Sequence, residues 1–141
     1  MSFLGQVRKK ALQANRRIVL PETGDERVIR AASLILKEGL AQVVLVGNQE
    51  AIMNSAKAYE VSLSGAKIVD PYNFERMNDY VNKLVELRAK KGMTPEEAKK
   101  ILLNDPNFFG AMLIRMGDAD GMVSGSASPT ANVLRAAIQV I

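Results

Sequence analysis

Short β-branched runs alternate with segments of helical periodicity along this chain, and this alternation constrains the fold more than any other feature. Compact apolar runs lie at residues 17–20, 42–46 and 67–69, and a fourth lies within residues 118–124. The segments between them repeat apolar residues every three or four positions, as amphipathic helices do. Strands separated by helices pair in parallel through right-handed crossovers. The sequence therefore predicts a three-layer α/β/α sandwich with a mainly parallel sheet of at least four strands.

Capping residues predict where the helices begin and end. Thr23 to Glu26 match a capping box, in which the threonine bonds a first-turn N–H and the glutamate reaches back. Gly39 is a natural stop for the helix that follows. Thr94 to Glu97 match a second capping box, with Pro95 at the first helical position. The predicted helices are residues 3–15, 23–39, 47–59, 74–92, 94–104, 108–116 and 130–141.

The composition excludes several kinds of chemistry. The chain has 141 residues, of which 48% are hydrophobic and 24% charged, with no cysteine and no histidine. Disulfides, thiolate nucleophiles, His-based acid–base catalysis and the commonest zinc ligands are therefore absent, and we expect no metal site. No apolar run approaches the roughly 20 residues that cross a bilayer, and no signal-peptide pattern opens the chain. We expect a soluble cytoplasmic protein with no membrane partner.

The net charge of +4 is spread unevenly. Several basic residues fall within residues 1–17, where no acid precedes Glu22. A transit peptide is one interpretation, since such segments are basic and poor in acids. Serine is scarce there and the stretch runs into an apolar strand, which favours an amphipathic first helix. The basic residues are not interleaved with aromatic residues, so we expect no nucleic-acid partner.

The carboxyl ends of parallel strands are where open α/β sheets bind ligands, and the end of the first strand suggests an anion site. Arg27 falls in the first turn of the following helix, beside unpaired backbone N–H groups. Both features attract an anion. The alternative is a surface ion pair between Arg27 and Glu22 or Asp25, which is a common and weak interaction.

The end of the fourth strand leads into a loop of small residues that ends at Pro129. Such a loop lets the backbone approach a ligand closely, so that N–H groups and hydroxyls point at phosphate or carbonyl oxygens. It matches neither a Walker A motif nor the dinucleotide fingerprint, and a tight turn explains it equally well. Arg135, five residues into the next helix, favours an anion site. The predicted substrate loop consists of Ser124, Gly125, Ser126, Ser128 and Thr130.

Five separated motifs occur along the chain, namely Ile18–Thr23 with Arg27, Val43–Asn48, Lys67–Pro71, Glu86–Thr94 and Gly117–Gly125. Together they resemble the N-terminal half of the phosphate acetyltransferase (phosphotransacetylase) family, which includes the phosphate butyryltransferases. Each motif alone is weak, but they follow in the family's order over essentially the whole chain. Enzymes of this family move an acyl group between coenzyme A and inorganic phosphate.

The resemblance implies an isocitrate dehydrogenase-like architecture with two domains, in a homodimer. Coenzyme A, acetyl-CoA, acetyl phosphate and inorganic phosphate would be its ligands, with no tightly bound cofactor. Arg27, Arg88 and Arg135 lie where the family has arginines implicated in coenzyme A binding, and guanidinium groups suit its phosphates. From the pattern alone, Arg88 is more simply a basic residue at a helix C-terminus, favoured by the helix dipole.

The family's catalytic serine, arginine and aspartate lie in its second half, so we expect no catalytic residue in residues 1–141. The chain ends on an apolar helix at Ile141, and we expect the N-terminal part of a longer two-domain acyltransferase that is inactive by itself.

The last loop departs from the family pattern. After Ser-Gly the family commonly has a histidine, Ser/Thr residues, an acid and Leu-Arg-Pro, whereas this chain has Ser128, Pro129, Asn132 and Ala136 in that stretch. A phosphate propionyl- or butyryltransferase and a non-catalytic acyl-CoA-sensing domain therefore remain alternatives. A generic nucleotide-binding α/β domain is a third, although the glycine fingerprint it would need is missing.

Overall fold

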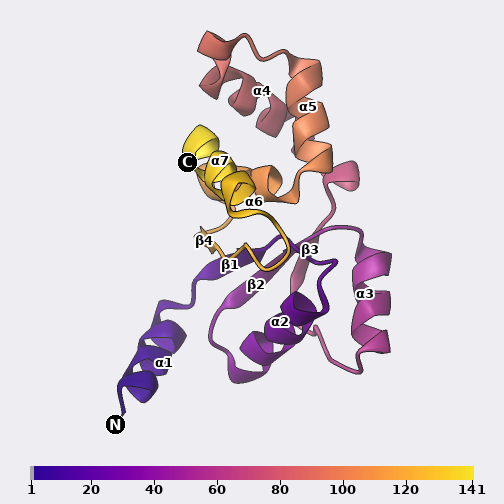
Figure 1. Cartoon of the computed structure of the whole chain (residues 1–141). Coiled ribbons are helices and arrows are strands. Elements are labelled where there is room, and N and C mark those ends of the chain that lie inside the picture. Colours follow the sequence, from indigo (N-terminus) through magenta and orange to yellow (C-terminus); the bar gives the residue numbers. More distant parts are fainter. Residues whose placement is uncertain (1) are drawn as a thin grey trace.

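One parallel sheet with helices on both faces forms the centre of the molecule (Figure 1). The structure is a computed structural model that describes residues 2–141. All paired strands are parallel, in the order β3-β2-β1-β4. The predicted α/β fold with four parallel strands is therefore confirmed. The strands are β1 (Arg17–Leu20), β2 (Gln42–Val46), β3 (Lys67–Val69) and β4 (Gly121–Met122).

The helices fall close to the predicted ranges. Gly39 ends the second helix in the left-handed conformation, with φ 65°, and the Thr94 hydroxyl caps the fifth by accepting from the Glu97 N–H at 3.2 Å. Short 3-10 turns occupy Pro71–Asn73 and Ala89–Lys91. The helices are α1 (Phe3–Ala14), α2 (Glu26–Glu38), α3 (Gln49–Ala58), α4 (Met77–Leu87), α5 (Pro95–Asn104), α6 (Pro106–Arg115) and α7 (Thr130–Val140).

The capping box predicted at residues 23–26 is wrong. Asp25 caps α2 instead, and the Thr23 hydroxyl donates to the carbonyl of Val46 at 2.7 Å. Gly47 leaves the space for this contact, because a Cβ there would lie 2.8 Å from the Thr23 Oγ1. A tertiary bond to the end of β2 thus takes the hydroxyl that a local cap would have used.

The two faces of the sheet carry separate buried clusters. Leu45 of β2 packs with Ile29 of α2 and Ile52 of α3. Val44, its neighbour in β2, belongs to the opposite cluster with Phe109 of α6. Successive side chains of a strand point to opposite faces, so an apolar run such as β2 is buried on both. The α2 and α3 layer, the sheet, and the α6 and α7 layer form the predicted sandwich (Figure 1).

The helices α4 and α5 lie beyond α6, away from the sheet (Figure 1). Aromatic rings connect α4 to α6. The ring centroid of Phe74, just before α4, lies 4.8 Å from that of Tyr80 in α4 and 5.2 Å from that of Phe109 in α6. The Tyr80 hydroxyl donates to the Asp118 carboxylate, to which Arg76 also donates at 2.6 Å. At the other end of the molecule, α1 contains no buried residue.

Gly110 lets α6 approach the sheet closely. A Cβ at this position would lie 2.7 Å from the Met122 Sδ and 3.2 Å from the Val19 Cγ1. Contacts under 3.0 Å require an atom to shift, so only glycine fits here without rearrangement. The middle of α6 is thereby held against β1 and β4.

Candidate functional site

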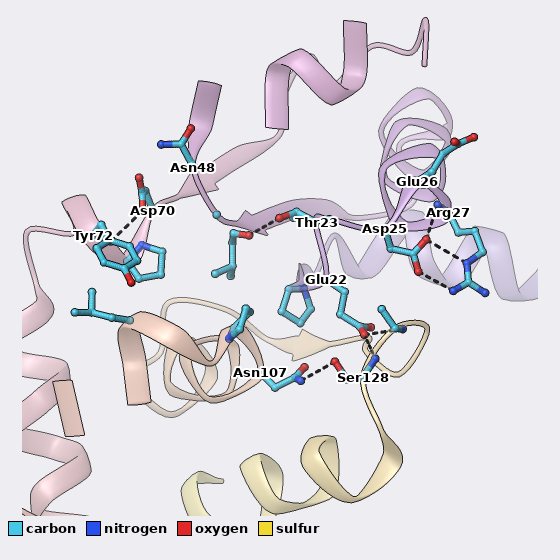
Figure 2. Close-up of a pocket in the computed structure, with 18 of the residues that line it drawn as sticks. Glu22, Thr23, Asp25, Glu26, Arg27, Asn48, Asp70, Tyr72, Asn107 and Ser128 are labelled. Carbon is cyan, nitrogen blue, oxygen red and sulfur yellow. Dashed lines mark hydrogen bonds and ion pairs between the residues drawn. The ribbon is translucent and has the colours of Figure 1, made fainter. Parts of the chain in front are cut away.

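The carboxyl ends of β1, β2 and β3 open onto a cleft of about 890 Å³ (Figure 2). Its walls include Asp25 after β1, Asn48 after β2, and Asp70 and Tyr72 after β3. Asn48 caps α3, and Asp70 accepts from the Tyr72 N–H at 3.0 Å. Open parallel sheets place ligands at this edge. Asp25, Asn48 and Asp70, however, already accept hydrogen bonds from nearby backbone N–H groups.

Glu22 lies at one end of the cleft, between β1 and the loop that follows β4. Its Oε1 accepts from the N–H groups of Gly125 and Ser126 at 2.7 and 3.0 Å. Its Oε2 accepts from those of Ala127 and Ser128 at 2.8 and 2.5 Å. The residue is only 9% exposed. The N–H groups of the predicted substrate loop therefore point at this carboxylate. From the sequence, we expected them to point at a ligand.

The loop determines the charge state of Glu22. Burial by itself would raise the pKa of this carboxyl, but the hydrogen bonds from Ser128, Gly125, Ala127 and Ser124 outweigh it and lower the pKa from 4.5 to about 2. Donors aimed at a carboxylate stabilise its charged form. Glu22 is therefore an ionised, almost buried anion at neutral pH.

Asn107, near the start of α6, binds two serine hydroxyls of the same loop. Its Oδ1 accepts from the Ser124 hydroxyl at 2.6 Å. Its Nδ2 donates to the Ser128 hydroxyl at 3.0 Å (Figure 2). The residue is only 5% exposed. Two of the serine hydroxyls that the sequence assigned to substrate are thus bonded to the protein's own amide.

Arg27 lies at the rim of the cleft, where its side chain contacts the loop. Its Nη2 donates to the Ser126 carbonyl at 2.7 Å. Its Nε and Nη2 also bind the Asp25 carboxylate at 3.1 and 2.8 Å (Figure 2). These hydrogen bonds lower the pKa of Asp25 to about 2. The surface ion pair with Asp25, one of the two interpretations of Arg27, is present. Of the three guanidinium nitrogens of Arg27, only Nη1 has no hydrogen-bond partner among residues 2–141.

The other two predicted arginines lie elsewhere. Arg88 ends α4 and Arg135 is in α7, and neither lines the cleft. The Nε of Arg88 is buried and has no hydrogen-bond partner in the part of the chain that the structure describes. Arg135 is exposed, and its Nη1 lies 3.5 Å from the Asn132 Oδ1. Thr130, the last member of the predicted loop, is exposed at the start of α7. The structure thus brings Arg27 to the loop but leaves Arg88 and Arg135 outside the cleft.

Sequence reasoning missed Glu22 and Asn107 as parts of this site. The loop residue Gly125 follows Glu22 by 103 positions and Ser128 follows Asn107 by 21, so no local spacing connects them. The only available signal was an acid placed directly after a strand that ends in proline. That signal does not indicate which residues bind the acid.

Two further findings bear on the chemistry of the site. Within residues 2–141, no group of three or more His, Cys, Asp or Glu side chains is arranged to hold a metal ion. None of the helices in that range combines the length and the apolar character that crossing a membrane requires.

The class of the protein follows from this geometry: an open parallel α/β fold whose small-residue loop, at the carboxyl edge of the sheet, is built around an anion. Comparison with protein families makes the assignment specific. Residues 2–141 match the family described as phosphate acetyl/butaryl transferase. The chain belongs to this family.

Individual relatives agree with the family match. The chain is 47% identical over 141 residues to a phosphate acetyltransferase of Acetivibrio thermocellus, covering all of this chain and 42% of that protein. It is 42% identical over 135 residues to the phosphate acetyltransferase of Bacillus subtilis, covering 96% of this chain and 41% of that one. The crystal structure of a phosphotransacetylase from Streptococcus pyogenes superposes with a TM-score of 0.92 at 39% identity, covering 100% of this chain and 43% of its own. The chain spans about two fifths of the length of these relatives.

Proposed function

We propose that this chain is the N-terminal α/β part of a longer acyltransferase that converts acetyl-CoA and inorganic phosphate into acetyl phosphate and coenzyme A, and the reverse. The observation that carries the proposal is the family match over residues 2–141, together with the 47% identity to a phosphate acetyltransferase. The relatives described above are named for acetyl transfer or phosphotransacetylation. These names support acetyl over longer acyl groups and over a non-catalytic sensor.

In this proposal residues 1–141 contribute to the binding of coenzyme A, and the catalytic groups lie in the second half of the protein. Arg88 supports this division most directly, because its buried Nε has no partner among the described residues. An unpaired buried donor costs roughly 1–3 kcal/mol. The Arg88 side chain as a whole is only half-buried. Its movement toward a phosphate oxygen of coenzyme A would give this N–H a partner and remove that cost through a charge-assisted hydrogen bond.

Arg135 and Arg27 would contribute in different ways. Arg135 is exposed and makes only a long contact with Asn132, so its planar fork is available to a phosphate. Arg27 has given its Nε and Nη2 to Asp25 and Ser126. It can offer a ligand only Nη1, which is a point contact rather than a fork. We therefore expect a larger share of coenzyme A affinity from Arg88 and Arg135 than from Arg27.

The test is steady-state kinetics of the full-length protein with Arg88→Ala or Arg135→Ala. The loss of a charge-assisted hydrogen bond corresponds to roughly ten- to a hundredfold in affinity, so KM for coenzyme A should rise by about that factor. KM for acetyl phosphate should change much less. Arg8→Ala is the matched control, because Arg8 of α1 pairs with Glu38 at 3.4 Å and neither residue lines the cleft. A full-length protein without transferase activity, or two variants with wild-type KM for coenzyme A, would contradict the proposal.

We also propose that the full-length protein is a homodimer. Leu134 and Ile138 of α7 are 53% and 80% exposed, and exposed apolar side chains of this kind favour association. Sedimentation velocity should show a species of twice the monomer mass. The cytoplasmic location stays a prediction.

A further inference from the structure

The loop after β4 has the geometry of an anion-binding site that is already filled. Four successive backbone N–H groups, from residues 125–128, converge on the two carboxylate oxygens of Glu22. Successive N–H groups arranged in this way form the concave nests with which proteins hold phosphate groups. Here the anion belongs to the chain itself.

Glu22 occupies the point of the sheet where a ligand is expected to bind. β1 leads into α2 on one face of the sheet, and the adjacent β4 leads into α7 on the other. Neighbouring strands whose connections leave on opposite faces define the point where open α/β sheets bind ligands. Glu22 follows β1 and the loop follows β4, so the carboxylate occupies that point. No backbone N–H of residues 125–128 is left there for a substrate phosphate.

We propose that Glu22 is a positioning residue for coenzyme A binding: its carboxylate substitutes for a ligand anion in the loop and thereby orients Arg27 and the helix that carries Arg135. The proposal rests on the proposed function, since it assigns a role in the coenzyme A site. It predicts that substrate phosphates are held by arginine side chains and not by this loop.

Two contacts transmit the position of the loop to the arginines. Arg27 donates to the Ser126 carbonyl at 2.7 Å, so its guanidinium is fixed between the loop and Asp25. The loop continues through Pro129 directly into α7, which carries Arg135. A loop that opens would therefore release Arg27 and displace the start of α7 together. The fully ionised carboxylate, with a pKa of about 2, keeps this contact intact at every physiological pH.

The first variant to test in the full-length protein is Glu22→Gln. The amide has nearly the same shape, but its NH₂ group faces N–H donors and cannot accept from them. Hydrogen–deuterium exchange of the peptide covering residues 123–131 should accelerate at least tenfold. KM for coenzyme A should rise by about tenfold or more, the equivalent of one charge-assisted hydrogen bond, while kcat and KM for acetyl phosphate change less. A residue that only stabilised the fold would lower the active fraction, and with it kcat, without this selective change in KM.

A second variant, Glu22→Ala, empties the nest and allows chemical rescue. Sodium formate should slow the exchange of residues 123–131 and lower KM for coenzyme A toward the wild-type value, whereas sodium chloride at the same ionic strength should not. Glu50→Gln is the matched control, because Glu50 is an exposed acid in the first turn of α3. It should change neither loop exchange nor KM.

The outcomes separate this proposal from the function on which it rests. Wild-type protein that neither binds coenzyme A in calorimetry nor transfers acetyl groups refutes the proposed function. Loop exchange that is the same in Glu22→Gln and wild type refutes the positioning role of Glu22, whatever the activity. Faster loop exchange with an unchanged KM for coenzyme A refutes it too, because the loop would then have no influence on the ligand site.

Discussion

Two carboxylates at opposite parts of the cleft have a pKa of about 2, but their hydrogen-bond partners differ. Glu22 lies at one end, between the ends of β1 and β4, a place called the crevice below, and Asp25 lies at the rim. Glu22 in the crevice binds a loop 103 to 106 residues away. Asp25 at the rim binds Arg27, two residues along the chain, whose side chain is 72% exposed. Similar pKa values therefore arise from a tertiary contact in one case and from a local contact in the other.

This difference determines what each contact does for the fold. A local pair with an exposed arginine re-forms easily and is weakened by water and salt, so it adds little stability. A carboxylate enclosed by backbone donors leaves those donors unsatisfied when it is removed, and each unsatisfied donor is costly. The crevice should therefore be sensitive to substitution and the rim tolerant of it.

The largest effect should come from Glu22→Gln. We expect the free energy of unfolding to fall by about 3 kcal/mol, because the bonds that lower the pKa of Glu22 by roughly 2.5 units favour the folded state. Urea unfolding followed by circular dichroism measures this change. A variant as stable as wild type would show that the crevice does not depend on its anion.

The same carboxylate should give a pH dependence of nearly equal size. The pKa of Glu22 is about 2 in the folded state against 4.5 for an ordinary glutamate, so its stabilisation is complete above pH 4.5 and is lost as the pH falls toward 2. The stability difference between wild type and Glu22→Gln should therefore shrink over this window. Asp25 and Asp120 also have lowered pKa values, but they are present in both proteins and cancel. A difference that stayed constant with pH would contradict the assignment.

Two glycine substitutions should differ in their effect on stability, with an intermediate loss for Gly110→Ala beside the crevice and almost none for Gly24→Ala. Gly110→Ala places a Cβ 3.2 Å from Val19 and 2.7 Å from the more flexible Met122, and such overpacking costs about 1–3 kcal/mol. Gly24→Ala at the cleft meets no atom within 4 Å and should leave stability near wild type. Thermal unfolding of the two variants makes the comparison. Equal melting temperatures would show that α6 can retreat from the sheet without cost.

Asn107→Ala should destabilise the crevice by about 1–2 kcal/mol, because the Ser124 and Ser128 hydroxyls lose their partner. Asn54→Ala, at an exposed position of α3, is the control and should change stability by less than about 0.5 kcal/mol. Urea unfolding distinguishes the two. If both variants matched wild type, Asn107 would not contribute to holding the loop.

The smallest effect on stability should come from Arg27→Ala. Removing this exposed side chain leaves Asp25 in contact with water, so we expect a urea midpoint close to wild type and little dependence on salt. The same variant should have a smaller effect on KM for coenzyme A than Arg88→Ala or Arg135→Ala. A large loss of stability would place Arg27 in the same category as Glu22.

Much of the fold could be predicted because its signals are local. The apolar runs at residues 17–20 and 42–46 specify strands buried on both faces, and the helical periods between them impose parallel pairing. Gly39 and Thr94 end and begin their helices as predicted. Turn and cap chemistry of this kind involves residues within one turn of each other, so the sequence displays both partners at once.

The candidate site was predicted only in part, since its members are far apart in the chain. The small-residue loop and Arg27 were both recognised, but the loop was assigned to a ligand, and the expected cap at Thr23 was wrong. The assignment of the loop residues to substrate stays a prediction. In both places a partner that is remote in sequence accepts the hydrogen bonds. The Val46 carbonyl accepts from the Thr23 hydroxyl, and the Glu22 carboxylate accepts from the loop N–H groups.

The sequence by itself therefore determined the parallel α/β architecture, the order of its helices and strands, and the resemblance to the acyltransferase family that the comparisons confirmed. Only the tertiary structure decided which groups of the loop remain available to a ligand. Periodicity and capping depend on neighbours a few residues apart, whereas the environment of Glu22 depends on packing that brings residues more than 100 positions apart into contact. Burial then makes those few contacts strong, because a donor or a charge removed from water must find its partner within the protein.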